Sequence, residues 1–343
     1  MVMQLIGALS LPGAIVAGTV ALVVLVLSAN TAVKKMVDLA EYFKLSATFM
    51  GMTVVSLATS IPEITAHLTA SGGILAGSLD YKIGSAIVLG SNIGSDIVQQ
   101  TLILGMVVWV AGALYFRRYF LWKSMIPMIA TSTLCIFLAL DGTFSRIDGL
   151  ILFALFVGYT YYLYVDERRY YSASEKTEED SPAPAIKTPG QAWAAGAVTI
   201  AMMLATVLAA QAVLGVIERV VSATGVGGSL IGVVTLGIAS ALPELTTALA
   251  GARNNAHGIS LGTLIGSNIT NPLVAIGLGA VVSTYDVPRP LVAYDLPWAT
   301  ISGAILLGYL LWRKGRIGRW GAVYFVVMYA LYITFRALFF AVD

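Results

Sequence analysis

Residues 50–71 read MGMTVVSLATSIPEITAHLTAS, and residues 231–252 read IGVVTLGIASALPELTTALAGA. A shift of 181 positions superimposes the two stretches and lays the Pro-Glu pair that ends at Glu63 on the pair that ends at Glu244. Each stretch is an apolar run of helix length with one carboxylate near its middle. The chain therefore carries an internal duplication, and its best matched residues include a charged group inside each apolar segment.

A charged side chain at the centre of a bilayer costs about 2.5–3.5 kcal/mol on insertion scales, so it normally faces a cavity, a partner or an ion. Two glutamates at equivalent positions predict one shared central site. The proline before each glutamate removes a backbone donor and frees a carbonyl in the preceding turn, which lipid alone cannot satisfy. A purely structural hydrogen-bonding role is the alternative for either glutamate taken singly.

Composition predicts an all-α polytopic membrane protein. The chain has 343 residues, of which 58% are hydrophobic and 11% charged, and a spanning helix needs about 20 apolar residues. Ten runs qualify: 11–31, 47–71, 84–110, 120–140, 147–165, 192–216, 227–251, 259–283, 291–312 and 320–340. The single cysteine, Cys135, lies within one of them.

The basic residues predict the orientation in a plasma membrane. With ten helices and both termini outside, fifteen of the 20 Lys and Arg residues fall on the cytoplasmic side, as the positive-inside rule requires. The five on the outer side are Lys82, Arg146, Arg219, Arg289 and Arg336. The loop 166–190 is then cytoplasmic, and its acidic, proline-rich composition predicts a flexible linker.

Five helices in each copy force the second copy to enter the membrane in the opposite orientation. The predicted organisation is a first five-helix repeat at 1–165, the linker at 166–190 and a second five-helix repeat at 191–343. Inverted repeats of this kind place their substrate near the midplane, on interrupted helices at the interface between the halves.

A second pair of matching motifs, GSNIGSD at 90–96 and GSNITNP at 266–272, follows the two glutamates. Ser91 and Ser95 are four residues apart and share a helix face, as do Ser267 and Asn271. Asp96 adds a third carboxylate at a depth where apolar residues are expected. The sequence thus predicts oxygen-bearing side chains around the paired glutamates.

These motifs resemble those of the cation/calcium antiporters, and in particular the prokaryotic type of Na⁺/Ca²⁺ exchanger. SLATSIPEI with GSNIGSD and GIASALPEL with GSNITNP are similar to the two α-repeats of that family. The resemblance implies a hub of the second, third, seventh and eighth helices, around which the first and sixth slide for alternating access.

The resemblance also implies a set of ion ligands. Glu63 and Glu244 are the principal calcium ligands, and main-chain carbonyls four and seven residues before them add calcium and sodium ligands. The remaining positions on which the resemblance places ligands are Thr59, Ser240, Ser56, Gly237, Ser91, Ser267, Ser95 and Asn271.

One position departs from the family pattern, because Ser95 stands where Asn or Asp is common and Asp96 follows it. Either Asp96 turns inward and adds a third carboxylate to the site, or it points elsewhere and the site keeps two. The helical step of about 100° per residue disfavours a shared face with Ser91. The stoichiometry and the coupling of protons depend on this choice.

The expected function is Ca²⁺/Na⁺ antiport by alternating access. Calcium prefers six to eight oxygens from carboxylates, carbonyls and waters. Two carboxylates neutralise one Ca²⁺, whereas three Na⁺ on the same ligands leave one positive charge, so exchange would be electrogenic. The ions and the lipid bilayer are the expected partners; no cofactor, nucleic acid or protein partner is indicated.

Three other functions compete with this expectation. In H⁺/Ca²⁺ antiport, buried carboxylates carry protons in place of sodium, and potassium is a further candidate counter-ion. A cation channel needs a continuous multi-site pore and no counter-ion. An intramembrane enzyme is disfavoured, because the sequence has no HExxH zinc motif, nucleophile elbow or phosphate loop.

Overall fold

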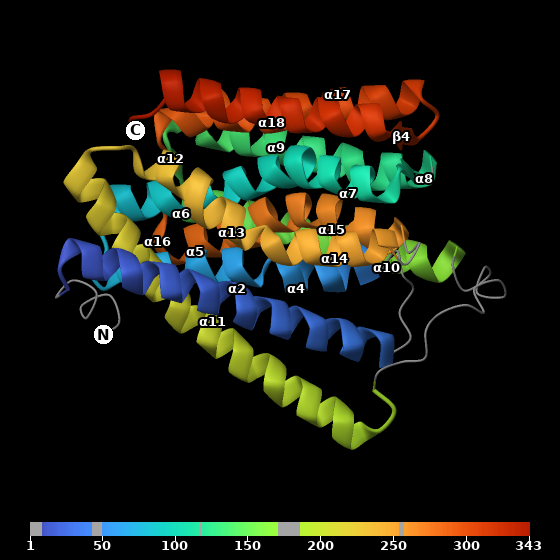
Figure 1. Cartoon of the computed structure of the whole chain (residues 1–343), viewed down its shortest axis with the longest axis horizontal. Coiled ribbons are helices and arrows are strands. Elements are labelled where there is room, and N and C mark those ends of the chain that lie inside the picture. The colour runs from blue at the N-terminus through green and yellow to red at the C-terminus, as the bar shows by residue number, and fades with distance from the viewer. Residues whose placement is uncertain (1–8, 43–49, 117, 171–185, 254–256) are drawn as a thin grey trace.

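The computed structural model describes residues 9–42, 50–116, 118–170, 186–253 and 257–343, and these residues are almost entirely helical (Figure 1). Nine of the described helical spans are long and apolar enough to cross a membrane. In chain order their elements are α2 (Leu11–Tyr42); α6 (Tyr81–Val98), η2 (Gln99–Ile103) and α7 (Leu104–Ala111); η3 (Leu121–Met125), α9 (Ile126–Leu138) and η4 (Ala139–Asp141); α10 (Arg146–Tyr170); α11 (Pro189–Thr224); α12 (Gly228–Gly232), η5 (Val233–Gly237), α13 (Ile238–Ser240) and α14 (Leu242–Arg253); α15 (His257–Thr270), η6 (Asn271–Ile276) and α16 (Gly277–Ser283); η7 (Leu291–Asp295) and α17 (Leu296–Trp312); and α18 (Arg319–Phe339).

The predicted run at 47–71 is described from Met50 onward and is a helix in three pieces. It consists of the π-helical turn η1 (Met50–Val55), α4 (Ser56–Thr59) and α5 (Ile61–Leu75). Together with the nine other spans it accounts for all ten predicted runs, and the predicted all-α polytopic fold is confirmed. The first few residues of this run and most of the predicted linker, 171–185, lie outside the described residues.

Two short antiparallel ribbons, which were not predicted, join loops of the two halves. β1 (Ala113–Tyr115) pairs with β4 (Arg316–Gly318), and β2 (Thr143–Phe144) pairs with β3 (Tyr285–Asp286). The first ribbon joins the loop after the third helix to the loop after the ninth, and the second joins the loops after the fourth and eighth. In a ten-helix count the loops of each ribbon fall at the same end of the bundle, so the pairing agrees with that count.

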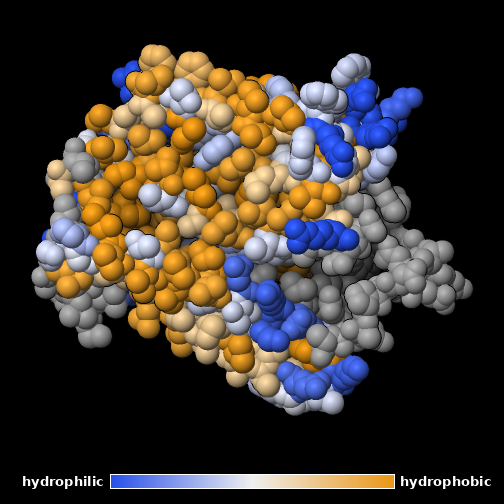
Figure 2. Space-filling model, viewed as in Figure 1, coloured by the Kyte–Doolittle hydropathy of each residue, from blue (hydrophilic) through white to orange (hydrophobic). Residues whose placement is uncertain are grey.

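The helices α2 and α11 form a pair along one side of the molecule, below the other helices in Figure 1. A buried hydrogen bond of 2.8 Å joins the hydroxyls of Ser28 and Thr206 across this pair. Figure 2 shows apolar side chains over most of the visible face, while hydrophilic ones gather mainly at its right-hand end. This distribution suits helices whose sides face lipid.

The centre is built by helices that cross between the two halves. α6 packs against α12 and η5 of the second half, and α15 packs against η1 and α4 of the first. A Cβ atom on Gly90 would lie 2.2 Å from the Ser229 carbonyl oxygen, and one on Gly232 would lie 2.3 Å from the Ile87 carbonyl oxygen. Only glycine permits this approach, which explains the first residue of the first GSN motif.

Arg336, one of the five basic residues on the predicted outer side, belongs to a buried ion pair. Its side chain is fully buried on α18, and its Nε lies 2.9 Å from a carboxylate oxygen of Asp295 on η7. Its Nη2 donates a hydrogen bond of 2.5 Å to Ser229 on α12, and the Tyr332 hydroxyl donates one of 2.6 Å to Asp295. This buried ion pair therefore ties the ninth and tenth helices to the start of the seventh.

Candidate cation site

The two glutamate-bearing helices are broken at equivalent points. The α-helical geometry lapses at Ser60, with ψ of 3°, and at Ala241, with ψ of −3°, whereas a regular helix has ψ near −42°. The proline two residues later in each case has no N–H to donate to the residue four before it. Glu63 and Glu244 consequently lie in the first turns of α5 and α14, beside freed backbone carbonyls.

Both glutamates are buried at the crossing of the four central helices, with exposed fractions of 1% and 0%. Their polar neighbours come from both halves of the chain. Ser95 donates a hydrogen bond of 2.8 Å to Oε1 of Glu63, and Ser240 of the second half is also near this carboxylate. Glu244 is close to Glu63 and has the hydroxyls of Thr59 and Ser267 beside it. The structure therefore brings the two carboxylates together, as the duplication predicts.

Several buried oxygens around the pair have no hydrogen-bond partner among the described residues. They are Oε2 of Glu63, both carboxylate oxygens of Glu244, the amide oxygens of Asn92 and Asn271, and the hydroxyl of Ser91. Buried polar atoms are normally paired, so a group of unpaired acceptors in one place requires an explanation. Carboxylate, amide and hydroxyl oxygens are the ligands that hard cations such as Ca²⁺ use.

Asp96 turns inward. It is buried, and its Oδ1 accepts a hydrogen bond of 2.8 Å from the side-chain amide of Asn271 in the other half. Within the described ranges, however, no three His, Cys, Asp or Glu side chains are grouped closely enough to hold one metal ion. A cation bound between the glutamates would therefore also need hydroxyl, amide and main-chain oxygens.

The other predicted site residues are buried in the same region. The hydroxyls of Thr59 and Ser267 lie 3.1 Å apart across the two halves. Ser56 is paired with Thr270 of the second half at 2.8 Å. The Gly237 carbonyl accepts a hydrogen bond of 3.3 Å from Ser240.

Sequence reasoning missed a chain of hydrogen bonds that ends at Glu63. Ser302 on α17 donates to Gln100 at 3.2 Å, Gln100 donates to Asn268 at 2.7 Å, and Asn268 donates to Gln99 at 3.1 Å. Gln99 then donates to Ser95 at 3.0 Å. Because an amide nitrogen can only donate, the Ser95 proton is directed to Glu63. The sequence marks Gln99 and Gln100 only as polar residues at an unexpected depth.

The two glutamates therefore have different surroundings. Glu63 accepts a hydrogen bond of regular geometry from Ser95, whereas Glu244 accepts none of such geometry from the described residues, although the hydroxyls of Thr59 and Ser267 lie beside it. One turn beyond Glu63, the ring Nδ1 of His67 is hydrogen-bonded to the Tyr285 hydroxyl at 3.0 Å. His67 thus makes a polar contact with a tyrosine of the second half.

Comparison with known proteins gives matches over most of the chain. The family model described as sodium/calcium exchanger protein matches residues 13–165 and 194–338. The inner membrane protein YrbG of Escherichia coli (strain K12) is 28% identical over 306 residues, which cover 86% of this chain and 87% of that protein. The putative antiporter CaxA of Alkalimonas amylolytica is 26% identical over 334 residues, covering 94% and 97%.

A solved structure of the sodium-calcium exchanger NCX_Mj has a similar fold. It superimposes with a TM-score of 0.63 and 22% identity, and the match covers 95% of this chain and 98% of that one.

Proposed function

Because the chain belongs to the sodium/calcium exchanger protein family, we propose that it exchanges Ca²⁺ for Na⁺ across a membrane by alternating access. It is a multi-pass membrane transporter, not an enzyme. The observation that carries the proposal is the pair Glu63 and Glu244, which are buried side by side with three of their four oxygens unpartnered among the described residues. Both ions would use these carboxylates in turn, which makes their binding mutually exclusive.

The remaining ligands of the proposed site are uncharged oxygens apart from Asp96. Ser91, Ser267 and Asn271 offer side-chain oxygens, and the unpartnered atoms of Ser91 and Asn271 support their inclusion. The main chains at the helix breaks offer carbonyls. The other residues of the proposed set, which offer hydroxyl, carboxylate or main-chain oxygens, are Thr59, Ser240, Ser56, Gly237, Ser95 and Asp96. Such a set provides the oxygen ligands that calcium prefers over nitrogen or sulfur.

The proposed exchange moves charge. One Ca²⁺ is neutralised by the two glutamates, while three Na⁺ on the same ligands carry one charge more. The transport rate should then depend on the membrane potential.

Alternating access would come from the α2–α11 pair. These helices lie along one side of the central crossing (Figure 1), so they can move against it without separating the GSN helices from the glutamate-bearing helices. We assign residues 1–165 and 191–343 to the two inverted repeats, both termini to the outer face and the loop 166–190 to the cytoplasm. The pairing of β1 with β4 and of β2 with β3 supports the ten-helix count, and the excess of basic residues on one side supports the orientation.

H⁺/Ca²⁺ exchange is the second candidate, and Asp96 is the observation that favours it. A third buried carboxylate beside the pair provides one more group that could carry a proton. Its hydrogen bond from Asn271 links it directly to the second half of the site. Sodium coupling and proton coupling can be told apart by measuring which ion gradient drives calcium uptake by the whole protein.

The test is uptake of radioactive calcium into proteoliposomes that hold the purified protein, with sodium, potassium and proton gradients imposed one at a time. We expect a sodium gradient alone to drive accumulation, at a rate that changes when the membrane potential is clamped. Accumulation driven by a pH gradient without sodium would select proton exchange. Rapid calcium entry that needs no counter-ion would indicate a channel and contradict the proposal.

A further inference from the structure

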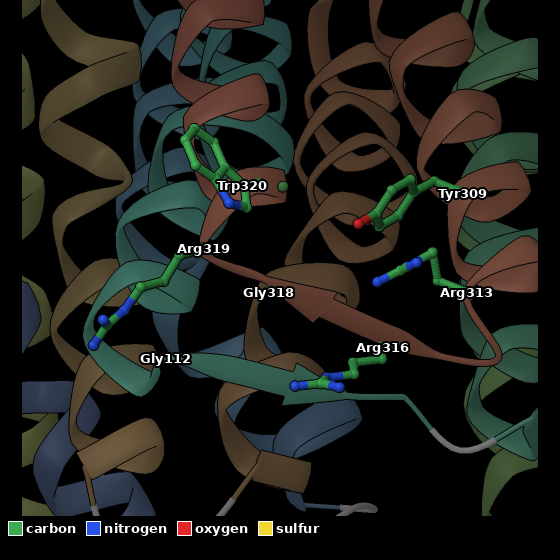
Figure 3. Close-up of a pocket in the computed structure, with 8 residues that line it drawn as sticks. Gly112, Tyr309, Arg313, Arg316, Gly318, Arg319 and Trp320 are labelled. Carbon is green, nitrogen blue, oxygen red and sulfur yellow. The ribbon is translucent and has the colours of Figure 1, made fainter.

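A basic hollow of about 400 Å³ lies where the ends of α7, α17 and α18 meet. Figure 3 shows Arg313 and Tyr309 on one side of it, Arg319 and Trp320 on the other, and Arg316 between them on β4. In the proposed orientation this hollow opens at the cytoplasmic end of the bundle. It is separate from the candidate cation site, with which it shares no residue.

The β1–β4 ribbon fixes the segment that carries these arginines. Arg316 is opposite Tyr115 in the register of the ribbon, and its guanidinium lies over the Tyr115 ring, 5.7 Å from the ring centroid. The Phe116 amide donates a hydrogen bond of 2.7 Å to the Gly315 carbonyl. The segment that carries the three arginines is thus hydrogen-bonded to β1 and the residue after it.

The three arginines have no anionic partner within the described part of the chain. All three are exposed, and no Asp or Glu carboxylate there lies within ion-pair distance of any of them. By contrast, Lys123, which lies at the same predicted end of the molecule, forms an ion pair with Asp166. A hollow lined by three unneutralised guanidinium groups is suited to an anion, and arginine binds phosphate with particularly good geometry.

An apolar groove of about 350 Å³ lies between α7 and α18, next to the ends of these helices that line the hollow. It is lined by residues of 105–110 on α7 and of 322–327 on α18, whereas the hollow includes Gly112 and residues 319–321 at the adjoining ends of those helices. Every lining side chain of the groove is a glycine, alanine, valine, methionine or tryptophan. At its base, a Cβ atom on Gly105 would lie 2.9 Å from the Ala322 carbonyl oxygen.

The tryptophans place the hollow at the depth of a lipid headgroup. Trp312 and Trp320, on either side of the arginine segment, are 76% and 88% exposed. Tryptophan is enriched where a membrane protein meets the interface between hydrocarbon and water. The basic hollow is therefore at the interface, and the groove lies on the hydrocarbon side of it.

We propose that the hollow and the groove together form a binding site for one anionic phospholipid of the cytoplasmic leaflet. The phosphate and headgroup occupy the hollow between Arg313, Arg316 and Arg319, and an acyl chain occupies the groove between α7 and α18. The adjacent apolar groove favours a lipid over free phosphate as the occupant, because phosphate has no apolar part to bury there. Basic pockets between transmembrane helices on the cytoplasmic side are suited to such headgroups.

The test is native mass spectrometry of the purified full-length protein, titrated with phosphatidylglycerol or with phosphatidylcholine of the same acyl chains. We expect wild type to bind phosphatidylglycerol more tightly. Each basic residue near an anionic headgroup adds a similar favourable contribution to the binding free energy. Arg319→Gln should therefore weaken this binding about 5-fold, and Arg316→Gln combined with Arg319→Gln about 30-fold.

Lys314→Gln is the matched control, because Lys314 is exposed in the same segment but does not line the hollow. It removes one charge and should leave binding within about 2-fold of wild type. Val323→Trp fills the groove from its exposed side and should weaken phosphatidylglycerol binding without altering the arginines. Millimolar inorganic phosphate should not displace the lipid.

Three kinds of result would overturn the proposal. The first is phosphatidylglycerol binding that is unchanged in the double arginine variant or in Arg319→Gln. The second is an equal loss in Lys314→Gln, which would reduce the effect to net charge. The third is full displacement by inorganic phosphate, or no effect of Val323→Trp, which would make the hollow a site for a free anion. None of these outcomes depends on transport, so the lipid site and the proposed exchange are tested separately.

Discussion

Replacing Arg336 by methionine should destabilise the protein strongly, because it leaves the Asp295 charge buried without its cationic partner. Both side chains are 0% exposed, and the Arg336 Nε lies 3.1 and 2.9 Å from the two carboxylate oxygens. Removing one partner of such a pair costs about 3–5 kcal/mol. In Arg336→Met, the Tyr332 hydroxyl would be the one described donor left to Asp295, and Ser229 would lose its contact with the tenth helix.

Removing both charges should cost far less than removing one. An apolar replacement of a whole buried ion pair is often neutral or stabilising, so Asp295→Leu with Arg336→Met should recover most of the stability lost in either single variant. The assay is the free energy of unfolding in mixed micelles for wild type, the two single variants and the double variant. Lys35→Met is the control, because the Lys35–Asp38 pair is partly exposed and should contribute less than about 1 kcal/mol. A loss below about 1 kcal/mol in Arg336→Met, or a double variant as unstable as the sum of the two, would refute the reasoning.

Three further predictions concern the centre of the protein. Gly90→Ala should lower the free energy of unfolding by about 1–3 kcal/mol or more through overpacking, while Gly158→Ala, whose Cβ would meet no atom within 4 Å, should not; equal effects would contradict the proposed crossing. Asp96→Asn should retain some calcium flux in proteoliposomes but change its dependence on sodium or pH, and an indistinguishable variant would mean that this carboxylate has no part in transport. Gln99→Leu removes two hydrogen bonds, the one that Gln99 donates to Ser95 and the one that it accepts from Asn268, each worth about 1 kcal/mol, and should shift the apparent calcium affinity about 5-fold or more; an unchanged affinity would show that the chain of hydrogen bonds does not position the site.

The main features of the centre are predictable because the duplication and the bilayer act together. The Pro-Glu pair recurs after 181 positions, and a carboxylate in lipid must face a cavity, a partner or an ion. These two facts place Glu63 beside Glu244 without knowledge of any contact, and the structure has them there. The ten helices follow from apolar runs long enough to span, for which lipid leaves no structure but a helix.

The surroundings of each glutamate were not predictable to the same degree. Helix periodicity places Asp96 on a different face of α6 from Ser91. Which residue covers the face of Asp96 depends on how α6 crosses the helices of the second half. Gly90 and Gly232 allow the close crossing of α6 and α12, and Asn271 of η6 contacts Asp96 from the eighth helix. The order of donors from Ser302 to Glu63 depends in the same way on side-chain orientation across four helices.

The buried pair Asp295–Arg336 was not predictable from the count of basic residues on each side. Arg336 is near the end of a predicted span, so the positive-inside rule treats it as a residue at the outer flank. Asp295 lies within a predicted span and could have signalled a buried partner. Their pairing depends on how the ninth and tenth helices pack together, and the sequence alone does not show which residues of two helices face each other.

The central claim is that one carboxylate from each half holds calcium and sodium in turn. The most direct measurement is sodium-driven uptake of radioactive calcium into proteoliposomes by Glu63→Gln and Glu244→Gln, beside Asp141→Asn, which changes a carboxylate in an exposed turn. Each glutamine variant should lose uptake, while Asp141→Asn should keep it. Substantial sodium-driven uptake in either glutamine variant would contradict the account.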